Sequence, residues 1–308
     1  DVTFESVASM SGLATIAQLD SAERKSRLES ARRAIATHPL VTAAIELLGA
    51  ARAIYATQAD ADGDLIAIDT ALAQAYNSRL DGANAQRHAE LAIARAEVLA
   101  DRAPMPLAHA LMTHGVALQR LGRGAEAMAN FERAQALFER AGAEGLEGLA
   151  SVLHNRGWVA DAQPDYVAAL GWYEQALARK RALLGPDHPS TLNSEMSRSS
   201  TLGRLQRLPE AEAALIALLP RVERVMGGKS QLLQISLNEL GSVRQDLGHY
   251  DAALTAYQRA LATQQDQEGG NPSAQTAITI NNLASLHEDR GDLAAAEALV
   301  DRRGAEVQ

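Results

Sequence analysis

Residues 241–260, which read GSVRQDLGHYDAALTAYQRA, decide the fold of this chain because their pattern occurs three times. Residues 115–134 read GVALQRLGRGAEAMANFERA, and residues 157–176 read GWVADAQPDYVAALGWYEQA. In each copy a glycine is followed, at steps of twelve, four and three, by an alanine, an aromatic residue and a second alanine. The first two copies are 42 residues apart (157 − 115 = 42), and the last lies twice that distance further on (241 − 157 = 84). A period maintained over this length predicts a protein of stacked repeats.

The spacing inside the pattern predicts two helices packed as an antiparallel hairpin. On the second helix of the last copy, Ala253, Tyr257 and Ala260 fall at i, i+4 and i+7, which places them on one face. Glycine or alanine on the facing helix allows the two backbones to approach closely. We therefore expect the ring of Tyr257 to be buried where the facing helix presents Gly241. Gly122, Gly248 and Gly291 are expected in the turns between paired helices.

This pattern resembles the tetratricopeptide repeat, in which a small residue, an alanine, an aromatic residue and a second alanine stand at these offsets. Residues 173–192, which read YEQALARKRALLGPDHPSTL, resemble the longer-period subclass found in kinesin light chain and in many bacterial regulatory proteins. That subclass lengthens the second helix and continues through a G-x-D-H-P linker. The resemblance implies an all-α fold, a right-handed α-solenoid of antiparallel helix hairpins.

The chain divides into about six such repeats after an N-terminal helical hairpin. Residues 1–63 are expected to form an N-terminal helical cap or a divergent repeat, with a connector helix from an upstream domain as the alternative. Within that segment, helices are expected from Asp20 to Thr37 and from Leu40 to about Gln58. The superhelix is expected over 64–308, with repeats at about 64–103, 106–142, 148–189, 190–231, 232–272 and 273–303.

The fourth repeat keeps the phase but has lost most of the signature. Ser199, Ala211, Leu215 and Leu218 stand where the other repeats have the small residues and the ring. In the linker before it, Gly185 is expected to end a helix, and Ser190 or Thr191 is expected to cap the next one after Pro189.

Composition and motifs exclude several classes of function. The net charge of −9 argues against direct binding of nucleic acid, whose phosphates require surplus Lys and Arg. The basic run at 24–33 is interpreted as a solvated helix face. The absence of cysteine excludes disulfides and thiolate metal sites. Glu46 and Arg52 interrupt the most apolar N-terminal stretch, so no membrane insertion is expected.

The sequence also lacks the motifs of a glycine-rich phosphate loop, a zinc protease and a serine hydrolase. We therefore expect no catalytic residue, no metal site and no cofactor, and a chain that is not an enzyme. The chain begins with Asp1 rather than methionine, which suggests a piece of a longer protein, so any catalytic activity would lie elsewhere. A cytoplasmic location is expected.

Candidate binding residues lie on the first helix of each hairpin, which the resemblance places on the inner face of the superhelix. Asparagine is a poor former of helix interiors yet recurs there, and its amide can bond both the C=O and the N–H of an extended peptide. In the family that the chain resembles, asparagines at matching positions contact peptides. Arg120 and Arg204 could pair with a carboxylate, and Trp158 could add an apolar contact. The predicted peptide-binding residues are Arg120, Asn155, Trp158, Asn193, Arg204, Asn238, Gln245, Asn281 and Asn282.

The alternative for these asparagines is that they bond one another or water between adjacent helices. The fourth repeat has Met196 and Ser197 where the ladder would continue, so the ladder is interrupted in the middle.

Two functions remain. The first is a non-catalytic module, the sensor or scaffold part of a larger regulatory protein, that binds a protein or peptide in its concave groove. The second is a structural module that self-associates, as a possible homo-oligomer, or docks a catalytic domain through its outer face.

Overall fold

The computed structural model describes residues 41–58, 60–268 and 274–306. The helix predicted from Asp20 to Thr37 and the basic run at 24–33 lie outside these residues. In the described part of the chain all regular structure is helical, with thirteen α-helices and no strand. The predicted all-α fold of helical hairpins is confirmed.

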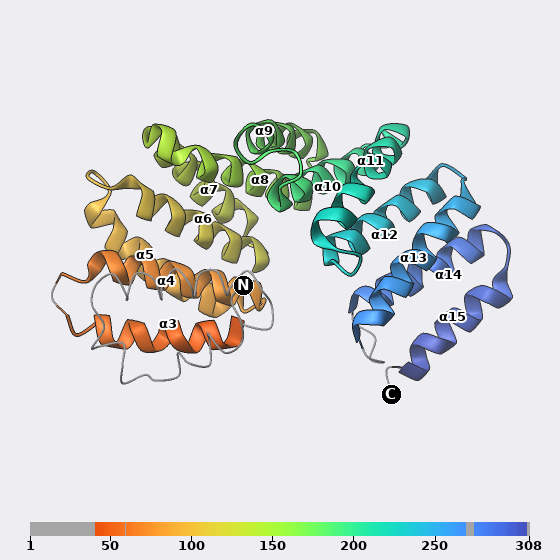
Figure 1. The fold of residues 1–308 in the computed structure, drawn as a ribbon, viewed down its shortest axis with the longest axis horizontal. Coiled ribbons are helices and arrows are strands. Elements are labelled where there is room, and N and C mark those ends of the chain that lie inside the picture. The colour runs from red at the N-terminus through yellow and green to blue at the C-terminus, as the bar shows by residue number, and fades with distance from the viewer. Residues whose placement is uncertain (1–40, 59, 269–273, 307–308) are drawn as a thin grey trace. The chain divides into compact units, whose positions relative to one another are not determined.

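The chain forms two compact units, residues 1–163 and 164–308. The described helices of the first unit include α3, which corresponds to the helix predicted from Leu40 to about Gln58. They are α3 (Val41–Tyr55), α4 (Asp62–Ser78), α5 (Gly82–Leu99), α6 (Pro104–Arg120), α7 (Gly124–Arg140) and α8 (Leu146–Ala162), with a 3₁₀ turn η4 (Gly142–Gly145) (Figure 1).

The second unit continues the same alternation. Its helices are α9 (Tyr166–Leu184), α10 (Pro189–Arg204), α11 (Leu208–Met226), α12 (Gln231–Asp246), α13 (Tyr250–Glu268), α14 (Ala274–Asp289) and α15 (Leu293–Glu306). Each predicted repeat between 64 and 303 contains one pair of helices, while the predicted domain division at residue 63 stays a prediction.

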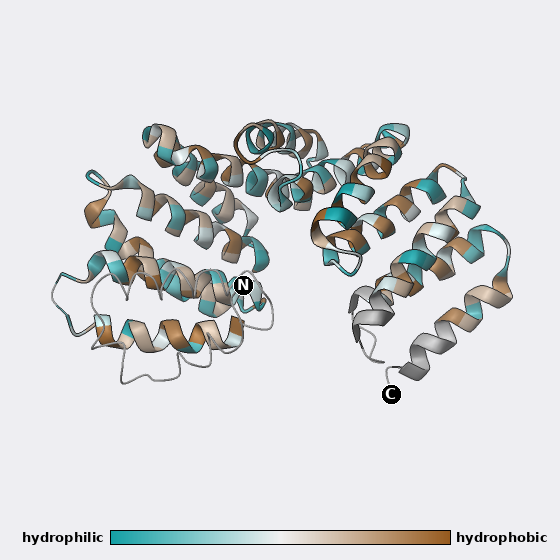
Figure 2. Cartoon of the chain, viewed as in Figure 1, coloured by the Kyte–Doolittle hydropathy of each residue, from teal (hydrophilic) through white to brown (hydrophobic). Residues whose placement is uncertain are grey.

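Within each unit, helices pack against their neighbours in sequence and against the next helix but one. In the first unit α4 contacts α6 and α6 contacts α8; in the second α10 contacts α12 and α12 contacts α14. These are the first helices of successive hairpins, so they form one layer and their partners form the other. Apolar and polar residues alternate along the helices, as expected of helices that bury only one face (Figure 2).

The glycine and ring of the signature meet as predicted. A Cβ atom added to Gly115 would overlap the ring of Phe131, and one added to Gly241 would overlap the ring of Tyr257. Both rings are buried. The absence of a side chain at each glycine therefore creates the space that the ring fills. Gly122, Gly248 and Gly291 have φ near +76°, which confirms them as turn residues.

The fourth repeat retains its core with a different set of side chains. Leu215, which replaces the ring, and Leu218 are almost completely buried on α11, as is Ala211. Ser199 occupies the glycine position on α10, where its Oγ donates to the Glu195 carbonyl at 2.8 Å. That bond satisfies the hydroxyl inside the helix, so this larger residue is accommodated without an unpaired polar group.

The linker between α9 and α10 confirms one expectation and corrects another. Gly185 ends α9 with φ of +85°, as predicted. The cap of α10 is His188, whose Nδ1 accepts from the Ser190 N–H at 3.2 Å, so the prediction of Ser190 or Thr191 as the cap is wrong. Pro189 takes the first helical position, which moves the cap to the residue before it. Thr191 instead donates its hydroxyl to the Gly185 carbonyl at 2.9 Å.

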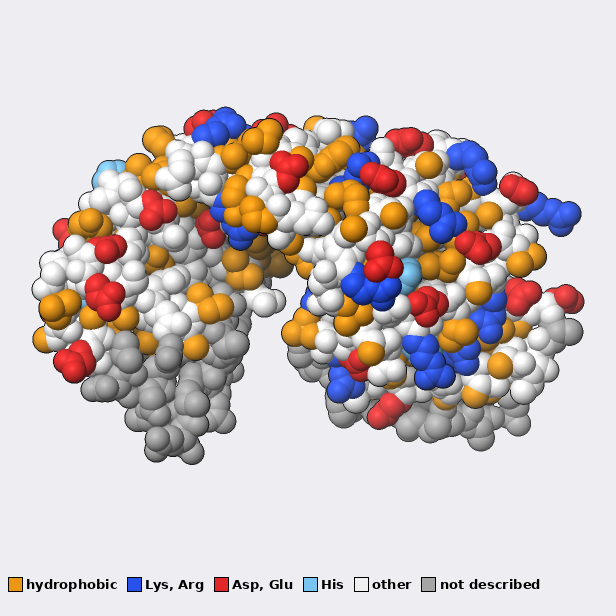
Figure 3. Space-filling model, turned by 180° about the vertical axis from the view of Figure 1, so that it is seen from behind, with side chains coloured by type: hydrophobic (Ala, Val, Ile, Leu, Met, Phe, Trp, Pro, Cys, Tyr) orange, Lys and Arg blue, Asp and Glu red, His pale blue; other side chains and the backbone are white. Residues whose placement is uncertain are grey.

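Charged side chains of both signs appear on the face that Figure 3 presents. In the first unit Lys and Arg side chains lie among Asp and Glu side chains, whereas much of the second unit shows Asp and Glu with few Lys and Arg in this view. Several arginines of the described helices form ion pairs, including Arg123 with Glu126 and Arg133 with Glu97.

Candidate functional site

The first helices of the hairpins in the first unit, α4, α6 and α8, line two adjoining pockets, which together we call the first-unit groove. One lies between α4 and the start of α6, has a volume of about 380 Å³ and is named the His109 pocket. Its lining consists of Gly63, Ile66, Ala67, Thr70, Gln74, Met105, Pro106 and His109. The other has a volume of about 270 Å³ and is named the Arg120 pocket. Its lining consists of Gln74, Asn77, Ser78, Met112, Thr113, Val116, Arg120 and Asn155.

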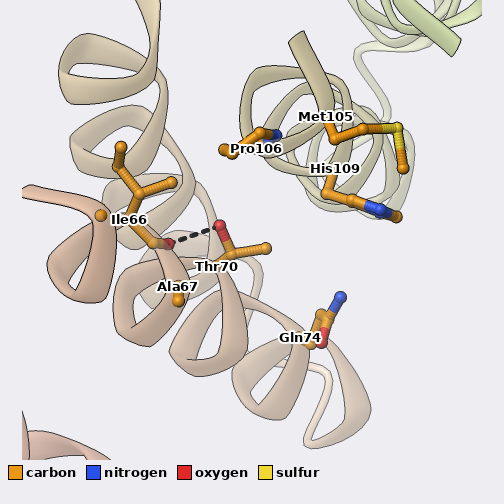
Figure 4. A pocket seen from close by; sticks show the side chains of 8 residues that line it. Ile66, Ala67, Thr70, Gln74, Met105, Pro106 and His109 are labelled. Carbon is orange, nitrogen blue, oxygen red and sulfur yellow. Dashed lines mark hydrogen bonds between the residues drawn. The ribbon is translucent and has the colours of Figure 1, made fainter. Parts of the chain in front are cut away.

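The His109 pocket is mainly apolar. Figure 4 shows Ile66, Ala67 and Thr70 on α4 across from Met105 and Pro106 on α6. The Thr70 hydroxyl donates to the Ile66 carbonyl at 2.7 Å, so its hydrogen is used inside α4 (Figure 4). This lining is suited to an apolar side chain.

Besides Thr70, the polar residues of the His109 pocket are Gln74 and His109. The His109 ring packs edge-on against Phe138, with ring centroids 5.1 Å apart and planes inclined at 72°. Phe138 is fully buried on α7, so this contact fixes the imidazole beside the pocket. Gln74 also lines the Arg120 pocket, which makes it the residue that the two pockets share.

Arg120 lies at the end of α6, with its guanidinium carbon 5.9 Å from the centre of the Trp158 ring on α8. Such a position over an aromatic face is a cation–π contact. No carboxylate among the described residues forms an ion pair with it. Arg120 is exposed as a whole residue, but partial loss of water around its side chain disfavours the cation and lowers its pKa from the usual value.

Two asparagines of the Arg120 pocket have unused hydrogen-bonding capacity. Asn77 is only 6% exposed, and its Nδ2 donates to the Thr113 carbonyl at 3.2 Å. Its Oδ1 is buried and has no partner in the described part of the chain. Asn155, on α8, is half-buried, and its amide likewise has no bond within the described residues. A buried acceptor without a partner costs about 1–3 kcal/mol.

Three of the predicted residues thus come together in the first unit. Arg120 and Asn155 line one pocket, and Trp158 supports the Arg120 side chain. Sequence reasoning did not select Gln74 or Asn77 for the groove. For Asn77 a signal was present, because it is another asparagine inside the first helix of a hairpin.

In the second unit Asn238 connects two inner helices. It is 7% exposed, and its Nδ2 donates to the Gln234 carbonyl at 3.2 Å and to Thr279 Oγ1, on α14, at 3.0 Å. Bonding between adjacent helices is the alternative role expected for these asparagines. Its Oδ1 has no partner among the described residues.

Gln245 likewise joins α12 to its neighbours. Its Nε2 donates to Asp289 Oδ2 at 2.6 Å and to Ser285 Oγ at 3.3 Å, and its Oε1 accepts from the Tyr257 hydroxyl at 3.2 Å. Both ends of this amide are therefore in use. A peptide would have to compete with these bonds.

The remaining predicted residues lie on α10 and α14. Asn193 and Asn281 are exposed, and Asn282 is half-buried. The guanidinium carbon of Arg204 lies 5.6 Å from the centre of the Tyr166 ring, an arrangement similar to that of Arg120 and Trp158. The peptide-binding role of all nine residues stays a prediction.

No helix within the described ranges is both long and apolar enough to cross a lipid bilayer. The same residues include no group of three or more His, Asp or Glu side chains arranged to hold a metal ion.

Paired helices in two layers, repeated along the chain, with a pocketed groove on the inner helices, define an α-helical repeat protein. A family model described as tetratricopeptide repeat matches residues 106–182, 191–266 and 232–302, and the chain belongs to this family. No curated protein matches the sequence closely enough to count as a relative.

Solved structures with the same fold include both kinds of protein that the sequence resembles. BtubC (BKLC) from P. vanneervenii is 21% identical with a TM-score of 0.62, over 70% of this chain and 87% of that chain. NprR, in complex with its cognate peptide NprX, is 14% identical with a TM-score of 0.64, over 92% and 78% of the two chains. A Rap protein complexed with competence and sporulation factor is 13% identical with a TM-score of 0.67, and the match covers 92% of this chain and 76% of that chain.

Proposed function

We propose that this chain is a non-catalytic binding module that holds an extended segment of a peptide or partner protein in the first-unit groove. The observation that carries the proposal is the convergence of unused polar groups on one pocket. Arg120 has no carboxylate, and Asn77 and Asn155 have unused bonding capacity, within the described residues. A folded protein usually pairs its polar groups with one another, so several unpaired polar groups beside one pocket indicate a binding site for a ligand.

The chemistry of the groove suits an extended peptide. A peptide in this conformation presents an N–H and a C=O at every residue, and a carboxamide can bond to both. The Asn155 amide is available for this in the Arg120 pocket, while the apolar His109 pocket next to it could take a side chain. Bonds to the backbone contribute affinity, and the side-chain pocket adds specificity.

Similar folds support this proposal. NprR has been solved with its cognate peptide, and a Rap protein with competence and sporulation factor. Tetratricopeptide domains are typically non-catalytic, and we propose that this one is the sensor or scaffold part of a larger regulatory protein. The peptide would then be the signal or the tethered partner.

Tryptophan fluorescence provides a test, because the chain contains only two tryptophans, Trp158 and Trp172. An immobilised array of random dodecapeptides, probed with the full chain, would first supply binding sequences. Titration of a resynthesised peptide is expected to change the emission of the wild type and of Trp172→Phe, and to leave that of Trp158→Phe unchanged. A change that persists in Trp158→Phe and disappears in Trp172→Phe would place binding outside this groove.

Removal of the Asn155 amide provides a second readout. Asn155→Ala is expected to weaken binding roughly fivefold, the effect of about one hydrogen bond. Gln175→Ala is a matched control, because it removes an exposed amide from α9. If no peptide binds and light scattering over a concentration series shows a defined oligomer, the assembly role becomes the better account.

A further inference from the structure

We propose that the Arg120 pocket receives a carboxylate of the bound segment, so that this module selects acidic peptides. The inference rests on the proposed peptide-binding function and adds the chemistry of the ligand. It follows from the environment of Arg120 and from the residues that surround it.

Arg120 differs from those arginines of the first unit that have a carboxylate partner. Arg123, three residues along the chain, donates to both carboxylate oxygens of Glu126 at 2.6 Å. Arg133 pairs with Glu97, and Arg156 pairs with Glu132. The Arg120 guanidinium has the Trp158 ring on one side and no carboxylate within the described part of the chain. Its N–H groups are thus available to an incoming anion.

The contact with Trp158 makes this cation a better receptor than a freely moving surface arginine. A ring against the guanidinium restricts its orientation and removes part of its water. A guanidinium that is already partly dehydrated and oriented loses less on binding a carboxylate in a bidentate manner. We therefore expect a specific interaction with an anion instead of a diffuse attraction.

The other lining residues favour a carboxylate over a phosphate. Arg120 is the one Arg or Lys that lines the pocket, and a single positive charge matches a carboxylate better than a dianion.

The two pockets together predict a spacing in the ligand. Along α4 their lining is centred near Ile68 and Tyr76, which a helical rise of 1.5 Å per residue places roughly 12 Å apart. An extended peptide advances about 3.3 Å per residue. An apolar residue about four positions from the carboxylate would therefore reach the His109 pocket while the carboxylate reaches Arg120.

The carboxylate could belong to Asp or Glu or to the end of a peptide, and two peptide arrays distinguish these sources. Random N-acetylated octapeptides would be presented with a free C-terminal carboxylate in one array and with a C-terminal amide in the other, and the full chain would be applied to both. Enrichment of Asp and Glu on the amide array would assign a side chain. Binding restricted to the free-acid array would assign the chain end.

Substitution of Arg120 tests the pocket itself. Arg120→Gln is expected to weaken binding of the selected peptides by roughly tenfold to a hundredfold and to remove the preference for a carboxylate. Arg120→Lys retains the charge, so it is expected to recover part of the binding and part of the preference for a carboxylate. Arg133→Gln, which makes the same change of charge on α7, is expected to bind as the wild type does. Circular dichroism of each variant would establish that it is folded.

Two other results would overturn the inference in distinguishable ways. If peptides bind the wild type without any dependence on a carboxylate, and Arg120→Gln binds them equally well, the carboxylate site is wrong while peptide binding stands. If the folded wild type binds no peptide on either array, the proposed function and this inference both fail.

Discussion

At the scale of single residues, Lys180 is a buried cation that forms no ion pair with a carboxylate among the described residues. Its side chain on α9 donates to Ser194 Oγ at 2.8 Å and to the Ser190 carbonyl at 3.3 Å, and the residue is 4% exposed. Burial lowers the pKa of Lys180 from 10.5 to about 8, because neutral acceptors do not fully replace the lost water.

Lys180→Met is expected to stabilise the protein near pH 7 by about 1–3 kcal/mol, because it removes a charge whose burial is unfavourable. In the wild type the pKa of Lys180 is about 8 in the folded state and 10.5 in the unfolded state. Between these values the unfolded state binds more protons, so this group makes stability rise with pH. Urea unfolding at a series of pH values would measure both effects.

In Lys180→Met the part of the rise of stability with pH that comes from Lys180 should be absent. Lys229→Met is the control for the loss of one positive charge, because Lys229 is an exposed lysine. An unchanged rise in Lys180→Met would mean that the group is better solvated than its 4% exposure indicates.

The glycines of the helices allow a matched pair of substitutions. Gly241→Ala is expected to lower stability by about 1–3 kcal/mol, because the added Cβ would overlap the Tyr257 ring. Gly171 lies inside α9, and an added Cβ there would meet no atom within 4 Å. Gly171→Ala is therefore expected to raise stability by about 0.5–1 kcal/mol. Thermal unfolding monitored by circular dichroism measures both, and a loss of stability in both variants would contradict this explanation.

At the scale of helices, Asp69 joins three elements of the first unit. It is fully buried on α4 and accepts from Arg52 Nε on α3 at 2.7 Å, from His88 Nδ1 on α5 at 2.8 Å and from Arg95, also on α5, at 3.0 Å. Burial would raise the pKa of Asp69, but the bonds from His88 and Arg52 outweigh it and hold the pKa below its usual 3.8. The carboxylate thus connects α3 to the hairpin that follows.

Asp69→Asn is expected to cost about 2–4 kcal/mol, because it removes the charge that compensates these cations. The pKa of Asp69 is lower in the folded state than its usual 3.8. Its contribution to stability is therefore fully present above pH 3.8 and is lost as the pH falls through the pKa of the folded state. Acid titration of unfolding would show a smaller loss of stability in Asp69→Asn than in the wild type. Asp101→Asn, at an exposed carboxylate between α5 and α6, is the control for the loss of one negative charge.

The sequence predicted those parts of the molecule that depend on nearby residues. Gly241 and Tyr257 are sixteen residues apart in one hairpin, so spacing alone was enough to place the ring against the glycine. The cap of α10 was missed because a histidine is an unusual cap. The Arg52 bond to Asp69 and the Asn77 bond to Thr113 join different hairpins and depend on how helices pack, which periodicity does not specify.

At the scale of the whole molecule, stability should vary from unit to unit. In a repeat protein each hairpin is stabilised mainly by its neighbours, so a local defect is felt most strongly nearby. Gly241→Ala is expected to reduce hydrogen-exchange protection in α11 to α14 more than in α4 to α7. Exchange measured by mass spectrometry would test this, and an equal loss of protection throughout both units would indicate a single cooperative structure.

The net charge of −9 also bears on binding at this scale. It repels an acidic peptide at long range, while the Arg120 pocket attracts its carboxylate at short range. Salt screens the first interaction more effectively than the second, because the Debye length at physiological ionic strength is about 8 Å.

The fit between each glycine and its ring has a consequence for how such a chain can evolve. A larger residue in place of Gly241 is harmful while Tyr257 is present, and a smaller residue in place of Tyr257 would leave a cavity. The two positions therefore restrict each other's mutations. In the fourth repeat both have changed, to Ser199 and Leu215, and its core is still filled. Divergence at these positions should proceed by paired replacement, which makes the pair, more than either residue, the unit that selection preserves.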